Sequence, residues 1–276
     1  MHDLLLWLAV GFYGLSVVLT LPSVSRRRPV LSPAALGALG LGLLAHGVAL
    51  GGEAVRLGRP PVADVRSALS FYAFLVTLAF LFAYLRYRIV SLGLFMLPLV
   101  FLFTLLSVLH PPGRFDSGAL RGGWLLVHTG SIFLGYTALF LTFVAAVMYL
   151  IQERELKSKQ PRGFYYRLPS LEVCDKLHYR SLVLGLPCLS LGLLTGFVWA
   201  TRAWKGPWGL DPKVVASLAT WVIYLVLFST RVSGAWRGRR AAYLAILGFA
   251  AILVTFVGAS LLSGLHGYVP KLGAGD

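Results

Sequence analysis

Charged side chains are scarce in this chain. Its 276 residues include 10 acidic and 25 basic residues, and the charged share is 13%, well below the roughly 25% of soluble domains. The acidic residues are too few and too dispersed to form a buried carboxylate pair. The sequence also contains no P-loop, Gly-x-Ser-x-Gly or dinucleotide-binding motif. These absences argue against a soluble domain and against a nucleophilic enzyme.

Cysteine is also rare, with only Cys174 and Cys188 in the chain. The two residues do not form a Cys-x-x-Cys motif. Cys174 falls in a basic stretch that we expect in the cytoplasm, and Cys188 falls inside an apolar run. These positions argue against a disulfide and against a thiol-redox function.

Long apolar runs are abundant, in keeping with a hydrophobic share of 58% and a mean hydropathy of +0.78. A helix of about 18 or more apolar residues is long enough to cross a bilayer. Transmembrane barrels instead have short strands of alternating polarity. We therefore predict an all-α polytopic membrane protein, with residues 1–276 forming one helical bundle of eight transmembrane helices. The predicted spans are 3–22, 33–52, 67–85, 89–108, 124–151, 181–201, 214–230 and 241–263.

Most of the basic residues follow every second apolar run. They are Arg26, Arg27 and Arg28; Arg86 and Arg88; Arg154, Lys157, Lys159, Arg162, Arg167, Lys176 and Arg180; and Arg231, Arg237, Arg239 and Arg240. Because cytoplasmic loops are enriched in Lys and Arg, we expect these connections in the cytoplasm and both termini on the outer side. The expected membrane is the cytoplasmic (inner) membrane of a bacterium. The net charge of +15 then reflects topology and contact with anionic lipids, not binding of nucleic acid.

This topology places two histidines and a Trp-rich loop on the outer face of the membrane. His128 lies about one turn into the fifth run, His266 follows the eighth, and residues 204–213 connect the sixth to the seventh. Haem iron accepts two axial imidazoles, and porphyrin faces favour flat apolar contacts. We therefore expect His128 and His266 as axial haem ligands, with Trp204 and Trp208 as an aromatic platform.

Further residues near this face complete the predicted haem site. Asp211 precedes Pro212, where it is placed to turn the loop and to orient a ligand histidine through a hydrogen bond. Haem propionates favour cationic partners. The candidate cations are Arg202, Lys213 and Arg121.

Each candidate also has a simpler structural interpretation. Tryptophans often lie at the membrane interface without binding a ligand, and His128 or His266 alone is compatible with a packed or interfacial polar residue. His46 is a less favoured ligand, and a hydrogen bond between helices is the preferred interpretation. Zinc is a weaker alternative because the histidines lack the local spacing of a zinc site.

Three segments resemble a known signature in order and spacing. They are Trp208-Gly209-Leu210-Asp211-Pro212-Lys213 with Trp221 and Thr230-Arg231 after it, Gly264-Leu265-His266-Gly267-Tyr268, and Leu126-Val127-His128-Thr129-Gly130-Ser131. They resemble the tryptophan-rich motif and the two external histidine segments of the CcsA/ResC/HemX-type cytochrome c assembly family. The resemblance covers most of the chain, is strongest over 124–268, and implies a haem-handling membrane protein.

The chain departs from the family pattern at four positions. Leu210 replaces the second tryptophan of the motif, Val214 replaces its glutamate, and Gly267 replaces a serine. Ser229 replaces the histidine of the family's H-T-R segment, so the resemblance does not extend to an intramembrane haem site. With these departures, the chain resembles most closely the short HemX-like branch.

The resemblance implies a protein that holds or delivers non-covalent, b-type haem on the outer face for cytochrome c assembly. Leu210 would then stand at a platform position. A second membrane subunit of a haem lyase system and apocytochrome c are the implied partners. The alternative is a membrane regulator of tetrapyrrole synthesis that acts on a cytoplasmic haem-synthesis enzyme through residues 152–180. A small-molecule transporter ranks last, because internal inverted repeats are not evident in the sequence.

Overall fold

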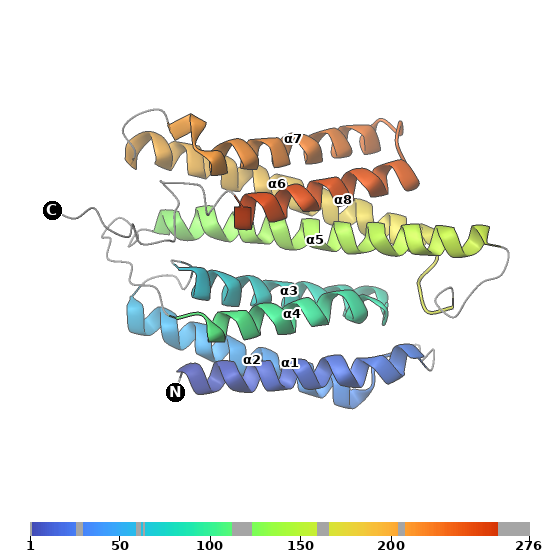
Figure 1. The fold of residues 1–276 in the computed structure, drawn as a ribbon, viewed down its shortest axis with the longest axis horizontal. Coiled ribbons are helices and arrows are strands. Elements are labelled where there is room, and N and C mark those ends of the chain that lie inside the picture. Colours follow the sequence, from blue (N-terminus) through green and yellow to red (C-terminus); the bar gives the residue numbers. More distant parts are fainter. Residues whose placement is uncertain are drawn as a thin grey trace.

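The computed structural model describes residues 2–25, 30–58, 62, 64–111, 123–158, 166–203 and 208–258. Over these residues the chain is all-helical, and eight of its helices are long and apolar enough to cross a membrane. The helices are α1 (His2–Ser25), α2 (Pro33–Leu57), α3 (Val65–Tyr87), α4 (Leu92–Leu109), α5 (Gly123–Lys157), α6 (Leu171–Ala203), α7 (Pro212–Val232) and α8 (Arg239–Leu253). This confirms the predicted fold class of a multi-pass helical membrane protein (Figure 1).

Successive helices run in opposite directions along the long axis of the bundle (Figure 1). Consequently α1, α3, α5 and α7 all begin at one end, which we call the His128 end. The opposite end is called the Arg231 end. Helix α1 packs on α2 and α4, α3 packs on α4, and α5 packs on α6 and α8. Contacts between α3 and α5 join the N-terminal four helices to the C-terminal four.

Three helices begin at side chains that satisfy the free amides of a first turn. The Ser32 hydroxyl accepts a hydrogen bond from the amide of Ala35 before α2. Asp64 and Ser67 form a reciprocal capping box at the start of α3. Asp211 caps α7 and is followed by Pro212, which needs no amide partner at the first helical position.

Glycines allow α5 and α6 to approach each other closely. A Cβ atom at Gly135 would lie 2.9 Å from the backbone nitrogen of Leu189, and one at Gly192 would lie 2.5 Å from the Ile132 side chain. Small residues of this kind permit tight packing between membrane helices, where apolar burial alone provides little association energy. The two longest helices are therefore held in a fixed register, which positions the side chains near their ends.

Residues 152–180 lie between the fifth and sixth predicted spans, and the structure extends both helices into this segment. Helix α5 continues to Lys157 and α6 begins at Leu171, so most of this segment is helical. The charged residues are compatible with helix because ion pairs one turn apart stabilise its exposed face. Glu153 pairs with Lys157 and Glu172 with Lys176, each at 2.6 Å.

The last helix is shorter than its apolar run. The expected span of 241–263 corresponds to α8 followed by a short π-helix, η3 (Val254–Gly258). Residues beyond Gly258 lie outside the described residues, so the structure does not test the remainder of this span.

Candidate functional site

His128 lies in the second turn of α5 and is half-buried against α6. Its Nδ1 atom is 2.8 Å from the carbonyl oxygen of Gly192. A carbonyl oxygen only accepts hydrogen bonds, so Nδ1 carries the hydrogen and donates it. In the neutral imidazole the other nitrogen, Nε2, then has a free lone pair. Metal-binding histidines commonly donate one ring N–H to a backbone carbonyl in this way, and His128 therefore fits the chemistry of an axial haem ligand.

The absence of a side chain at Gly196 leaves the space that the His128 ring occupies. A Cβ atom at Gly196 would lie 2.7 Å from Cε1 and 3.0 Å from Nδ1 of His128. Gly196 follows Gly192 by one helical turn, so the two residues form a groove of small residues on α6. One turn before His128, the indole Nε1 of Trp124 donates a hydrogen bond to the Thr195 carbonyl at 3.1 Å. The orientation of the histidine is therefore set by the backbone of α6.

The Trp-rich loop meets α6 near this groove. Residues Trp208–Leu210 form a short 3₁₀ helix, η2, just before α7. The half-buried Trp208 ring packs on Phe197, the residue after Gly196, with ring centroids 5.8 Å apart. Leu210 points outward and is 79% exposed. Trp208 and Leu210 thus lie at the same end of the bundle as His128, and Leu210 leaves an apolar surface uncovered.

Asp211 and Lys213 connect this loop to α7. The buried Asp211 carboxylate accepts a hydrogen bond from the Lys213 backbone amide at 3.0 Å. Asp211 therefore fixes the turn between η2 and α7. Lys213 is half-buried in the first turn of α7, at the same end of the bundle as His128. Arg202, in the last turn of α6, is exposed at the same end.

Three of the predicted site residues, His266, Trp204 and Arg121, lie outside the described residues. The structure therefore brings together His128, Trp208, Asp211 and Lys213 at one end of the bundle and does not test their relation to His266.

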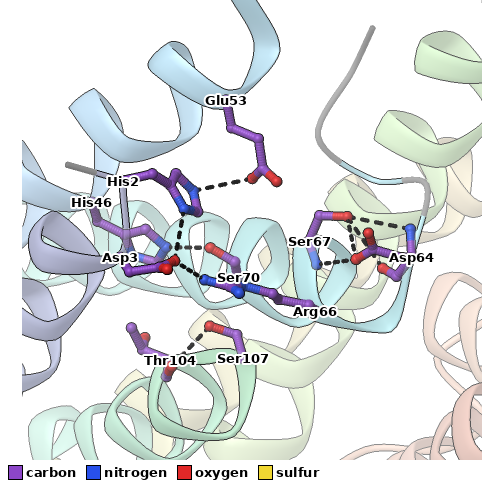
Figure 2. Close-up of polar contacts among 10 residues, drawn as sticks. All are labelled: His2, Asp3, His46, Glu53, Asp64, Arg66, Ser67, Ser70, Thr104 and Ser107. Carbon is purple, nitrogen blue, oxygen red and sulfur yellow. Dashed lines mark hydrogen bonds and ion pairs between the residues drawn. The ribbon is translucent and has the colours of Figure 1, made fainter. Parts of the chain in front are cut away.

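His46 has a different environment from His128. Its Nδ1 atom is 3.2 Å from the Tyr13 hydroxyl, and its Nε2 atom is 2.9 Å from the Ser70 hydroxyl. The residue is fully buried, and the contact with Ser70 is visible in Figure 2. His46 thus joins α1, α2 and α3, and both ring nitrogens are used in hydrogen bonds between helices.

An ionic cluster at the His128 end was not foreseen from the sequence. His2 Nε2 lies 3.2 Å from Glu53 Oε2, and His2 Nδ1 lies 3.3 Å from Asp3 Oδ1. Arg66 forms an ion pair with Asp3 (Figure 2). The cluster ties the ends of α1, α2 and α3 together. The signal in the sequence was a charged residue at the same end of three apolar runs: Asp3 begins the first, Glu53 directly follows the second, and Arg66 directly precedes the third.

Two residues of the sequence signature hold α7 against α6. The Trp221 indole donates a hydrogen bond to the Ser190 hydroxyl at 2.9 Å. At the opposite end, the buried Arg231 guanidinium binds both Asp175 carboxylate oxygens, at 2.8 Å and 2.9 Å, and lies over the Tyr179 ring. Both contacts position the Trp-rich loop indirectly, because they fix the helices on either side of it.

The fold and this site define a multi-pass helical membrane protein with a half-buried histidine that is held through Nδ1 by the backbone of the neighbouring helix. The family model described as cytochrome C assembly protein matches residues 40–266. The chain therefore belongs to the cytochrome c assembly protein family, which confirms the resemblance drawn from the motifs. The closer likeness to the HemX-like branch stays a prediction.

Several curated relatives are similar to this chain, and each of the three described below is named cytochrome c biogenesis protein CcsA. The relative from Guillardia theta is 29% identical over 244 residues, which cover 80% of each chain. The relative from Microcystis aeruginosa is 29% identical over 285 aligned positions, covering 84% of this chain and 87% of that protein. A Synechococcus relative is 34% identical over 172 residues, covering 54% of this chain and 57% of that protein.

Proposed function

We propose that this protein takes part in cytochrome c assembly by binding haem at the His128 end of the bundle. The observation that carries the proposal is the hydrogen bond from His128 Nδ1 to the Gly192 carbonyl. It leaves Nε2 as the nitrogen for haem iron, which accepts axial imidazole ligands. Membership of the family and the names of the relatives support the assembly function.

The proposed haem is b-type and non-covalently bound. His128 and His266 are its axial ligands, and Trp204, Trp208 and the exposed Leu210 form the surface against the porphyrin. Asp211 holds the turn that presents this surface. The proposed partners of the propionates are Arg202, Lys213 and Arg121, because guanidinium and ammonium groups pair with carboxylates.

The His128 end is proposed to face the outer side of the bacterial cytoplasmic membrane. The argument is the positive-inside rule, since basic residues concentrate in the connections of the Arg231 end. Haem held at the outer side is accessible to the thiols of an exported apocytochrome c. Because a haem-holding subunit acts with others to form the covalent bond, we expect a second membrane subunit as partner.

The alternative function, regulation of tetrapyrrole synthesis, relied on residues 152–180 as a cytoplasmic docking loop. Most of this segment is helix and continues α5 and α6. The relatives are named for cytochrome c biogenesis, which favours assembly.

The decisive test is the visible absorption spectrum of the purified protein, oxidised and reduced. We expect a Soret band with sharp reduced α and β bands, lost or shifted in both His128→Ala and His266→Ala. His110→Ala is the matched control, because His110 is an exposed histidine that follows α4 at the same end. A wild-type protein that stays without visible absorption after haem is added would refute the proposal.

The assembly function is tested in a bacterium that lacks its own assembly protein. Expression of this chain with its partner subunit is expected to restore haem-stained c-type cytochromes, and His128→Ala is expected not to. Raised levels of early haem-synthesis enzymes, with normal cytochrome c, would instead support the regulatory function.

A further inference from the structure

A pocket of about 380 Å³ opens at the Arg231 end of the bundle, far from the proposed haem site. It lies where the connection between α3 and α4 meets residues 166–173, which lead into α6. The end of α1 contributes Val24 to its wall. We call it the Arg88 pocket. Its volume is in the range of pockets that bind small molecules.

The polar lining of the Arg88 pocket is cationic. The residues that line it include two arginines, Arg88 and Arg167, together with two tyrosines and two serines. Among the residues that the structure describes, no acidic side chain lines the pocket. Guanidinium groups bind phosphate oxygens through paired hydrogen bonds, and hydroxyl groups can donate further ones. This set of side chains therefore matches a phosphate group.

Two helix N-termini add positive potential at the pocket. Helix α4 begins directly after Ser91, and α6 begins directly after Ser170, and both serines line the pocket. The N-terminus of a helix carries partial positive charge, which favours anions. Arg180 increases the charge nearby, because its Nη1 atom donates a hydrogen bond at 3.1 Å to the Tyr87 hydroxyl of the lining.

Arg88 itself occupies an unusual backbone conformation. It ends α3 with φ of 55°, and it is the only non-glycine residue with positive φ among those that the structure describes. Glycine is the usual residue at such a helix end. The Arg88 amide donates a hydrogen bond to the Tyr84 carbonyl at 2.7 Å, and its guanidinium lies 5.7 Å from the Tyr84 ring centroid. Arginine is therefore placed here at some conformational cost, at a position that lines the pocket.

The other wall of the pocket is apolar. Val24, Val90 and Val173 line it together with Leu168. The pocket lies where α3 ends and α4 and α6 begin, so a bilayer crossed by these helices would place its headgroup region close to it. An apolar wall next to a cationic one suits a molecule with a phosphate and a hydrocarbon part.

We infer that the Arg88 pocket binds a phosphate group, supplied by the headgroup of an anionic phospholipid. Arg88 and Arg167 bind the phosphate oxygens, and the apolar wall contacts the glycerol and the first acyl carbons. A soluble phosphate compound could bind the arginines in the same way, but it would leave the apolar wall without a contact. This inference does not depend on haem binding.

The test uses the full-length protein and native mass spectrometry. Phosphatidylglycerol, phosphatidylethanolamine and inorganic phosphate are titrated separately. The variants are Arg88→Gly, which removes the charge but suits the positive φ, and Arg167→Gln. Arg237→Gln is the matched control, because Arg237 is exposed at the same end and does not line the pocket.

We expect the wild type to prefer phosphatidylglycerol, and each pocket variant to bind it about tenfold more weakly, as loss of one charged hydrogen bond implies. The control variant is expected to bind like the wild type. If inorganic phosphate binds to the wild type, but not to the pocket variants, and the lipid preference is absent, a soluble phosphate is the ligand. Equal binding of all three probes by the wild type and both pocket variants would overturn the site.

Discussion

The Nδ1 atom of His128 and the carbonyl oxygen of Gly192 lie 2.8 Å apart and join the start of α5 to the last turns of α6. The bond sets both the tautomer and the direction of the imidazole. It also makes the proposed haem ligand dependent on the packing of two long helices. Changes in that packing should therefore alter haem binding without touching the ligand itself.

Gly196→Ala tests this dependence. The added Cβ would lie 2.7 Å from Cε1 of His128, so the ring must turn and lose its hydrogen bond to Gly192. That loss costs about 1 kcal/mol, and alanine gains about as much in helix propensity over glycine. We expect a nearly unchanged melting temperature and a reduced Soret absorbance per protein. Gly130→Ala, on the facing helix with nothing within 4 Å, should keep the full absorbance, and equal absorbance in both variants would contradict the argument.

Gly135→Ala should instead lower stability. Its Cβ would lie 2.9 Å from the nitrogen and 3.2 Å from the Cα of Leu189, and backbone atoms cannot move aside without separating α5 from α6. Overpacking of this kind costs about 1–3 kcal/mol. Thermal unfolding in detergent measures the effect, with Gly130→Ala again as the control. Identical melting of the two variants would mean that the helices are not in close contact at Gly135.

The eight helices were predictable from the sequence because length and hydropathy alone define a membrane-crossing helix. The limits of these helices in the polar segments at their ends were not predictable in this way. The sixth span was expected from residue 181, whereas α6 begins at Leu171. An apolar run stops at the first charged residues, but the helix does not. Glu172 and Lys176 form an ion pair that stabilises its exposed face.

Individual site residues were predictable, but their contacts were not. The motif indicated His128, whereas its partner Gly192 is 64 residues away. Arg231 and Asp175 are 56 residues apart. Such pairs depend on which helices are neighbours and in which register, and glycine contacts such as that at Gly135 decide the register only in three dimensions. One sequence contains no direct record of these contacts.

We expect the free energy of unfolding to depend strongly on both residues of the Arg231–Asp175 ion pair. The Arg231 side chain is only 6% exposed, so Arg231→Met leaves the Asp175 carboxylate without its cation. Removing one partner of a buried pair costs about 3–5 kcal/mol, and because Asp175 is one-third exposed, we expect the lower part of that range. The double variant Arg231→Met, Asp175→Leu should regain most of the loss.

Chemical unfolding of the two single variants and the double variant gives the coupling free energy directly. The exposed pair Glu153–Lys157 is the control, and Lys157→Met should cost less than about 1 kcal/mol. Additive effects at Arg231 and Asp175 would show that the two side chains do not interact in solution.

Substitution of His46 should lower stability and leave the haem spectrum unchanged, unlike substitution of His128. His46→Leu removes a hydrogen-bond partner from the Tyr13 hydroxyl and from the Ser70 hydroxyl. Unsatisfied buried polar groups cost about 1–3 kcal/mol each, so the melting temperature should fall. The haem spectrum per folded protein should not change, because both His46 ring nitrogens are already used. The triple variant His46→Leu, Tyr13→Phe, Ser70→Ala removes the imidazole together with both hydroxyls that it contacts, and should recover much of the stability. A loss of the Soret band that persists in this recovered variant would instead make His46 a residue of the haem site.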